Sequence, residues 1–269
     1  MRKLIGLILM SCCLSVFALE TTDEWQQGAV IRGQVEPGVT LEFLGRQVRL
    51  TSDRQFVIGL GRDFGDHAEL ITIAADGSRQ IHHFEVRQRE YNIQRVTGVP
   101  QRTVTPDPQQ VERSRREAAM ATAARKADLP LRHFGDAFIW PLTGRISGVY
   151  GSQRFYNGKP NSPHYGVDVA APVGTPVVAP AAGVVTLVHP DMFFSGGTLI
   201  IDHGHGLSST FLHLSKILVE EGAEIEQGQT IALVGATGRA TGPHLDWRMN
   251  WFDQRVDPTL LVGPMPKNQ

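Results

Sequence analysis

Short runs of alternating apolar and polar residues occupy much of the chain between residues 20 and 100. Turn-forming pairs such as Pro37-Gly38 and Asp76-Gly77 separate these runs. Alternation with a period of two is typical of strands that bury one face. The pattern predicts a small β-sandwich-like domain over residues 20–100. The runs cover residues 28–33, 39–43, 47–50, 55–58, 68–73 and 82–86.

A second series of apolar runs begins near residue 130 and is rich in Val, Ile, Leu and Thr. Glycine stands at nearly every junction, which favours short strands joined by tight turns. The sequence therefore predicts a mainly β protein whose C-terminal antiparallel β-sheet domain covers residues 130–262. The runs cover residues 144–151, 174–180, 183–188, 197–202, 208–213, 231–235 and 244–248.

The segment between the two series has a different composition. Prolines at positions 100, 106 and 108 indicate a linker. Residues 109–127 are rich in Ala, Arg, Glu and Gln and contain no Gly or Pro, which favours a helix. Residues 101–129 are therefore predicted to be a linker with one helix. Its apolar stripe is weak, so we expect a spacer or a helix that lies on the C-terminal domain.

The first 18 residues have the pattern of a secretory signal peptide. Arg2 and Lys3 precede an apolar run that ends at Ala18, and this run is shorter than the roughly 20 residues that a spanning helix needs. We expect cleavage after Ala18, export to the periplasm and no transmembrane helix in the mature chain. A lipoprotein is the alternative, because Leu9-Met10-Ser11-Cys12 loosely resembles a lipobox.

The charge of the chain limits its partners. The 269 residues include 26 Lys and Arg and 27 Asp and Glu, a formal net charge of -1. Nucleic-acid-binding domains usually carry a basic surface, so no nucleic-acid partner is expected. The two cysteines, Cys12 and Cys13, lie in the predicted signal peptide. Cleavage would remove both, and the mature protein would have no disulfide.

Five side chains in the C-terminal half could meet at one site. His164 and Asp168 stand four residues apart, with a glycine between them that allows the backbone to bend. His244 and Asp246 are two residues apart in a strand-like run, so their side chains leave the same face. Imidazole and carboxylate groups both suit zinc, at about 2.0–2.2 Å. These residues and His213 are predicted to form a divalent-metal site.

The positions of the other histidines indicate whether each is expected to bind a metal. Alternation would place His213 on the same strand face as Phe211. His203 and His205 fall in a predicted turn, where we expect exposed side chains rather than ligands. His82 and His83 are adjacent, so they would face opposite sides of a strand and are not expected to bind metal.

From about Trp140 to Asp257 the chain resembles the lysostaphin/LytM-type zinc metallopeptidases, which cleave bacterial cell-wall peptides. Each motif alone is weak, but the ordered set is specific, and it does not extend to residues 20–130. The matching motifs include His164-Tyr-Gly-Val-Asp168, Gly174-Thr-Pro-Val-Val-Ala-Pro180, Ile201-Asp-His-Gly204, Phe211-Leu-His-Leu-Ser215 and Thr241-Gly-Pro-His244.

The resemblance implies a role for each candidate residue. One Zn²⁺ per chain would be held by His164 and Asp168, with His213 as a catalytic histidine and His244 as the general base. The family's third zinc ligand is the second histidine of a His-x-His pair, and this position holds Asp246. The implied activity is zinc-dependent hydrolysis of peptide cross-links in peptidoglycan, with stem peptides as substrate.

The aspartate leaves two interpretations open. Asp246 could bind zinc directly, in a more anionic ligand set. Alternatively, the domain is catalytically degenerate and binds peptidoglycan, or activates a murein amidase as a cell-wall or divisome partner. An intact site is favoured because four of the five expected groups are present and the replacement can still bind a metal. A glycan-binding wall protein that uses the N-terminal domain is a further alternative.

Overall fold

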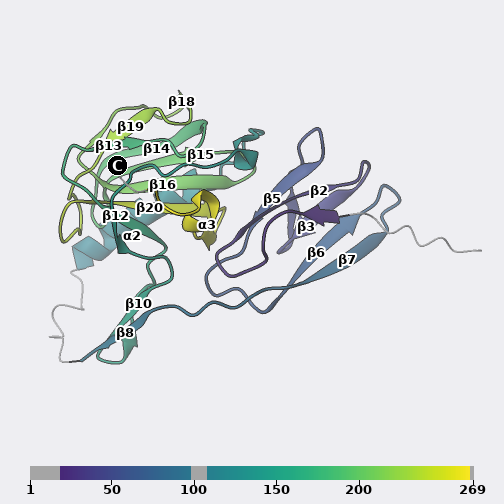
Figure 1. Ribbon diagram of the computed structural model, residues 1–269, viewed down its shortest axis with the longest axis horizontal. Coiled ribbons are helices and arrows are strands. Elements are labelled where there is room, and N and C mark those ends of the chain that lie inside the picture. The colour runs from purple at the N-terminus through teal and green to yellow at the C-terminus, as the bar shows by residue number, and fades with distance from the viewer. Residues whose placement is uncertain (1–18, 98–107, 267–269) are drawn as a thin grey trace, which may run out of the picture.

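The computed structural model describes residues 19–97 and 108–266. The predicted signal peptide and most of the proline-containing linker lie outside the described residues. Figure 1 shows two β-rich bodies side by side, with a small group of strands projecting below one of them. The predicted division into domains at residues 20–100 and 130–262 remains a prediction.

The N-terminal body consists of two small antiparallel sheets. One sheet contains β1 (Leu19–Thr21), β2 (Val30–Val35) and β5 (Gln55–Gly59). The other has the order β4 (Arg46–Val48), β3 (Thr40–Phe43), β6 (His67–Ile73) and β7 (Arg79–Glu85). Both sheets contribute fully buried side chains to the hydrophobic core, including Ile31, Leu41, Phe56 and Leu70. This arrangement agrees with the predicted β-sandwich.

An eight-stranded sheet dominates the C-terminal body, and its paired strands are antiparallel, as the sequence predicts. A three-stranded sheet of β13 (Pro176–Val178), β19 (Thr230–Leu233) and β17 (Lys216–Ile217) accompanies it. The order in the large sheet is β18 (Glu224–Ile225), β14 (Gly183–Met192), β15 (Gly196–Asp202), β16 (Leu207–Leu214), β20 (His244–Trp251), β12 (Gly166–Ala170) and β9 (Arg145–Gly148), with β21 (Gln254–Val256) also beside β20.

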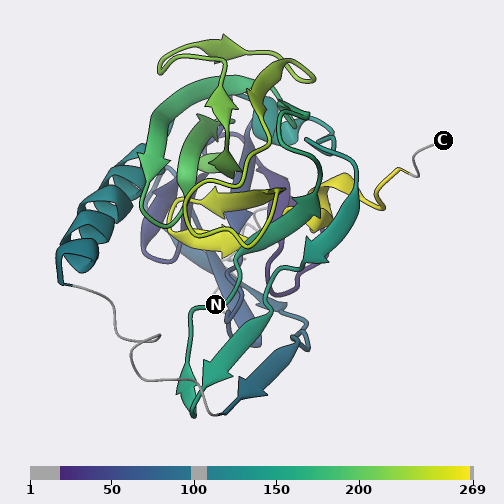
Figure 2. The ribbon, with the colours of Figure 1, turned by 90° about the vertical axis from the view of Figure 1, so that its left-hand side faces the viewer.

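A small sheet that the sequence did not predict joins distant parts of the chain. Strand β8 (Ile93–Val96) pairs in parallel with β10 (Gln153–Tyr156), which forms a hairpin with β11 (Lys159–Pro160). Figure 2 shows this sheet projecting from the C-terminal body. A parallel partner 60 residues away leaves no local turn signal, so periodicity could not reveal it.

Helix α2 (Pro108–Ala124) lies on the C-terminal body, against β14. Ala121 and Ala124 pack on Leu187, Met192 and Ile200 of the large sheet. The helix was predicted over residues 109–127, and it ends three residues earlier. Shorter helices lie at His133–Gly135 (η1) and Thr259–Val262 (α3). Within the described residues, no helix is long and apolar enough to cross a membrane.

The two bodies share one hydrophobic cluster. Gly59 of β5 packs so closely on Trp251 of β20 that a Cβ atom on the glycine would lie 2.6 Å from the Trp251 Cβ. The rings of Phe43 and Trp251 have centroids 5.7 Å apart. The N-terminal sheets are therefore packed on the C-terminal sheet.

Candidate metal centre

Antiparallel pairing of β12 with β20 gathers the predicted site residues. Asp168 lies directly opposite Asp246, and Ala170 lies opposite His244. Directly paired residues point to the same face of a sheet, so the two carboxylates leave from one surface. His164 precedes β12, and its backbone N–H donates to the carbonyl of Ser152 at 2.8 Å. The strand register therefore fixes the distances between these side chains.

The predicted metal ligands lie close together. Nε2 of His164 is 3.0 Å from Oδ1 of Asp168, and Nε2 of His244 is 3.9 Å from the same oxygen. One potential ligand atom each from His164, Asp168 and Asp246 lies within 4.8 Å of the other two. The structure thus brings together His164 and Asp168, which the resemblance implied as ligands, and Asp246, which stands at the position of the family's third ligand.

Two glycines leave room for the carboxylates. Gly148 of β9 lies opposite Asp168, and a Cβ atom on this glycine would be 2.1 Å from Oδ2 of Asp168. A Cβ atom on Gly166 would lie 2.8 Å from Oδ1 of Asp246. Such contacts are far below van der Waals separation, so only glycine fits at these two positions.

The donor atoms fit a divalent metal. Nε2 of His164 and Oδ1 of Asp168 are buried and have no hydrogen-bond partner among the described residues, although they lie at contact distance. Buried polar atoms without partners are costly, and a cation between them would satisfy both. Ligand atoms at zinc-bond distance in a tetrahedral site lie on the order of 3.3 Å apart. The separations here are close enough for a small side-chain adjustment to close the site.

The charge around His164 favours a cation at this position. Burial lowers the pKa of His164, but contact with Asp168 and the charges of Asp246 and Asp168 together raise it above its ordinary value. A proton held at the imidazole would compete with a metal for the same nitrogen, because a metal-binding histidine must be neutral.

An arginine partner of Asp246 was not predicted from the sequence. Arg248 Nε donates to Asp246 Oδ1 at 2.9 Å, and Nη2 donates to Oδ2 at 2.5 Å. Burial raises the pKa of Asp246, but the charge and hydrogen bonds of Arg248 hold it below its usual range. Each oxygen keeps a further lone pair that could bind a metal. The sequence did contain a sign of this contact, because residues two apart on a strand, such as Asp246 and Arg248, share one face.

His213 reaches the site by a route that alternation did not predict. Phe211 is paired with Trp247, whereas Leu212 is paired with Asp246, so the Phe211 side chain leaves the opposite face. His213 has a φ of 63°, in the left-handed region, and the strand register shifts nearby, between Gly197 and Leu199 of the neighbouring strand. The prediction that His213 shares the face of Phe211 is therefore wrong. This irregularity brings the ring toward the site.

The two predicted catalytic histidines lie side by side, with their rings tilted by 49° and the Nδ1 atom of each held by a backbone carbonyl. Their ring centroids are 4.7 Å apart. Nδ1 of His213 contacts the Thr237 carbonyl at 2.8 Å, and Nδ1 of His244 contacts the Gly242 carbonyl at 2.8 Å. A carbonyl only accepts, so each Nδ1 carries a proton and each Nε2 is left to exchange one. Burial lowers the pKa of His213, which favours its neutral form near pH 7.

His203 and His205 are buried, so their predicted exposure is wrong. Nδ1 of His203 lies 2.8 Å from the Ala182 carbonyl, and Nε2 lies 2.8 Å from Ser209 Oγ. Both nitrogens are thus engaged within the fold, and neither His203 nor His205 belongs to the metal-ligand group.

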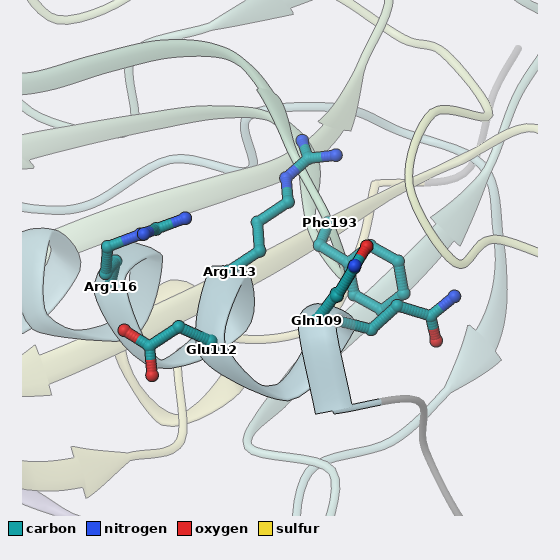
Figure 3. A pocket seen from close by; sticks show the side chains of 6 residues that line it. Gln109, Glu112, Arg113, Arg116 and Phe193 are labelled. Atoms are coloured by element: carbon teal, nitrogen blue, oxygen red, sulfur yellow. The ribbon is translucent and has the colours of Figure 1, made fainter.

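A hollow beside the start of α2 lies apart from this centre. Figure 3 shows the side chains around it, and none of the five candidate site residues contributes to its lining. It is lined by Gln109, Gln110, Glu112, Arg113, Arg116 and Phe193. The candidate metal centre is therefore defined by its clustered side chains, and it does not coincide with this hollow.

A family of known proteins matches the C-terminal part of the chain, which contains the candidate metal centre. The model of peptidase family M23 matches residues 162–258. The chain is 43% identical over 108 residues to peptidoglycan DD-endopeptidase ShyA of Vibrio cholerae, covering 39% of this chain and 24% of that protein. It is 39% identical over 104 residues to DD-carboxypeptidase/endopeptidase Mpg of Neisseria meningitidis, covering 39% of this chain and 24% of that protein. The chain spans about a quarter of these curated relatives.

A solved structure matches far more of the chain. The crystal structure of a candidate M23 peptidase from Pseudomonas aeruginosa has a TM-score of 0.70 and 32% sequence identity, and the match covers 90% of this chain and 96% of that one. The likeness therefore extends to the N-terminal sheets, beyond the region that the motifs cover. Since the match runs along nearly the whole of both chains, this protein belongs to peptidase family M23.

Proposed function

We propose that the protein is a zinc-dependent endopeptidase that hydrolyses peptide cross-links of bacterial peptidoglycan. The carrying observation is the pairing of β12 with β20, which groups His164, Asp168 and Asp246 beside two histidine rings. The named activities of the ShyA and Mpg relatives support this substrate class.

In this proposal the ion is held by Nε2 of His164, Oδ1 of Asp168 and one carboxylate oxygen of Asp246. These donors are the ones that zinc binds in hydrolytic sites. A bound zinc ion would supply Lewis acidity for the carbonyl and for water. The orphaned atoms of His164 and Asp168 support this assignment, because no described residue satisfies them.

The two histidines would move the protons. Nε2 of His244 takes a proton from the water that attacks the scissile carbonyl. The ring can then return this proton to the amine nitrogen as the peptide bond breaks, so the proton balance closes. His213 lies 4.7 Å away, between ring centroids. Because its Nδ1 holds the proton, its Nε2 can accept a hydrogen bond from the attacking water and help to orient it.

A second candidate is binding without cleavage. Both oxygens of Asp246 accept hydrogen bonds from Arg248, and this engagement weakens the aspartate as a metal ligand. If the ion is not held, the same surface could still bind a cell-wall peptide or a protein partner. Metal content separates the two candidates.

The test combines metal analysis with cleavage of isolated peptidoglycan. The mature chain should bind about one zinc ion and release soluble fragments from cross-linked murein. His244→Ala should keep the zinc and the fold and lose activity by about 10²–10⁴-fold, the range typical of a general base. His133→Ala is the matched control, because this half-buried histidine contacts Asp136 and lies outside the metal-ligand group. Absence of both zinc and cleavage at micromolar zinc would favour the binding protein.

We also propose export and cleavage after Ala18. The basic residues Arg2 and Lys3, followed by an apolar run that ends at Ala18, support this proposal. N-terminal sequencing of the protein recovered from the periplasm should begin at Leu19. A lipidated cysteine at position 12, found by mass spectrometry, would instead establish the lipoprotein alternative.

A further inference from the structure

Three arginines gather on the sheet face that carries the metal centre. Asp246, Arg248 and Asn250 alternate along β20 and therefore share one face. Arg255 of β21 is paired with Asn250, so it leaves from the same face. Arg125 follows α2, and its Nη2 lies 3.5 Å from Oγ1 of Thr210, the strand partner of Arg248. Helix α2 thus brings a third guanidinium to this surface.

The positive charge in this cluster is not balanced. Arg248 is paired with Asp246, but no described carboxylate lies within ion-pair distance of Arg125 or Arg255. The guanidinium of Arg255 instead stands 5.0 Å over the ring of Tyr165. Among the described residues, only one of the three guanidinium groups, that of Arg248, forms an ion pair with a carboxylate.

Burial makes this imbalance costly. Burial, followed by repulsion from Arg255 and Arg248, lowers the pKa of Arg125 to about 9. Burial and then the charge of Arg248 also lower the pKa of Arg255. A desolvated cation without a counter-charge is unfavourable, and an anion between these groups would relieve both desolvation and repulsion.

Nearby buried polar atoms also lack partners. Ser208 is 2% exposed and Asn250 is 1% exposed, and the two are paired across β16 and β20. Oγ of Ser208, Oδ1 of Asn250 and Nε of Arg125 have no hydrogen-bond partner among the described residues. Unsatisfied buried groups are rare in folded proteins, and a cluster of them indicates a missing ligand or ordered water.

The cluster lies within reach of a peptide bound at the metal centre. Arg248 is two residues from Asp246 along β20, a rise of about 6.8 Å on a strand. Arg255 contacts the ring of Tyr165, which follows His164 directly. Charged groups one or two peptide units from the scissile bond would therefore approach these arginines.

We propose that Arg125 and Arg255 form a subsite for a free carboxylate of the peptide substrate, beside the Asp246–Arg248 pair. This inference rests on the proposed function and adds a determinant of specificity to it. Guanidinium groups match carboxylates in shape and charge, and such charge-assisted hydrogen bonds are among the stronger ones in proteins. Arg125 lies outside the matched region 162–258, so the helical linker would take part in substrate selection.

The first test uses the zinc-loaded full chain and pairs of synthetic cross-linked peptides. Within each pair the peptides differ only by a carboxylate or a carboxamide, at a side chain in one pair and at the C-terminus in the other. We expect the preferred carboxylate peptide to be cut about 10- to 100-fold faster, as kcat/KM, than its amide, the ratio expected for one charged hydrogen bond. The pair that shows the preference identifies which carboxylate binds.

Variants assign that preference to the arginines. Arg125→Gln and Arg255→Gln should each remove most of the preference, by raising KM for the carboxylate peptide more than KM for the amide. Arg255→Lys should restore part of it, because the charge is kept. Arg115→Gln is the matched control, since this residue is exposed on the same helix. Unfolding midpoints of all variants would exclude loss of the fold as the cause.

A second test needs no catalysis. Calorimetry on the metal-free chain should give a dissociation constant for the carboxylate peptide at least 10-fold lower than for the amide peptide. Arg125→Gln should abolish this difference in affinity. Equal cleavage and equal binding of the two peptides would overturn the subsite and leave the endopeptidase proposal standing. Selective binding without cleavage of any peptide would support the subsite and contradict the proposed function.

Discussion

At the scale of single residues, the Asp246–Arg248 pair offsets the charge that an aspartate adds at the position of the family's third metal ligand. An aspartate in place of a histidine adds a negative charge to the site, which reduces the Lewis acidity of a bound ion. Arg248 donates to both oxygens and cancels that charge. The pair together therefore has the net charge of a neutral histidine, and this supports an intact site over a degenerate one.

The pair can be tested by exchange for the family's histidine. Asp246→His should still bind one zinc ion, but it leaves Arg248 without its partner. Since breaking a buried pair is strongly destabilising and Arg248 is 24% exposed, we expect a loss of about 1–3 kcal/mol in the free energy of unfolding of the metal-free protein. Adding Arg248→Met should recover most of this loss. Urea denaturation of the four proteins in the cycle measures it, and additive effects would contradict the coupling.

The buried His203 predicts a stability change with pH. Burial lowers its pKa from 6.5 to about 4, against a smaller raising effect of the Ala182 carbonyl. Between these values the unfolded chain holds a proton that the folded chain does not, so stability falls as pH drops from 6.5 to 4. Its contribution is about 1.4 kcal/mol per pH unit.

Asp202 acts in the opposite direction, because burial raises its pKa to about 6 and folding is then favoured as pH falls toward 3.8. Comparison with His203→Gln isolates the histidine. The variant should lose stability less steeply than the unmodified protein between pH 6.5 and pH 5, in denaturant titrations at each pH. Parallel curves would refute the assignment.

At the scale of elements, α2 supports the catalytic face through the β14–β15 hairpin. Glu117 is 9% exposed, and its Oε2 accepts from the backbone N–H of Phe193 at 2.7 Å. Two residues later, the carbonyl of Ser195 accepts from the backbone N–H of His213 at 2.8 Å. The helix therefore holds the hairpin that fixes the unusual backbone of His213.

Removal of the Glu117 side chain should disturb that support. Glu117→Ala leaves the Phe193 N–H unsatisfied, which should lower the free energy of unfolding by about 1–3 kcal/mol. It should also lower kcat, with KM little changed, because His213 would lose its fixed position. Glu112→Ala, an exposed position on the same helix, should leave both quantities unchanged. Unaltered kcat in Glu117→Ala would show that the hairpin does not need the helix.

At the scale of the whole molecule, the N-terminal sheets and the C-terminal sheet form one packed unit. Arg89 Nη2 lies 2.8 Å from Oδ2 of Asp257, which is 2% exposed, and Asp257 Oδ1 accepts from Thr259 at the start of α3. Together with the shared hydrophobic cluster, this ion pair joins the segment after β7 to the end of the matched region.

Arg89→Met should therefore weaken the whole protein. The substitution leaves the buried carboxylate of Asp257 without its cation, and we expect a loss of about 3–5 kcal/mol in the free energy of unfolding. Arg87→Met is the control, since Arg87 pairs with Glu24 on the surface, where solvent screening makes an ion pair contribute little to stability. Calorimetry should show one transition for the unmodified chain. Two separate transitions in that chain would contradict a single packed unit.

The sequence by itself determined what depends on local pattern. Alternation and apolar runs predicted most strands of the two bodies, and composition predicted α2. Ordered motifs identified the candidate site of His164, Asp168, His213, His244 and Asp246. These features are readable because a strand's period and a motif's spacing lie within a few neighbouring residues.

Only the tertiary structure decided which side chains meet. The pairing of β12 with β20, the left-handed backbone at His213 and the burial of His203 depend on partners far away in the chain. The same holds for Arg125 and Arg255, which follow α2 and lie in β21, respectively, and become neighbours by packing. A one-dimensional pattern contains no register between distant strands, and the free energy of burying a charge depends on that register.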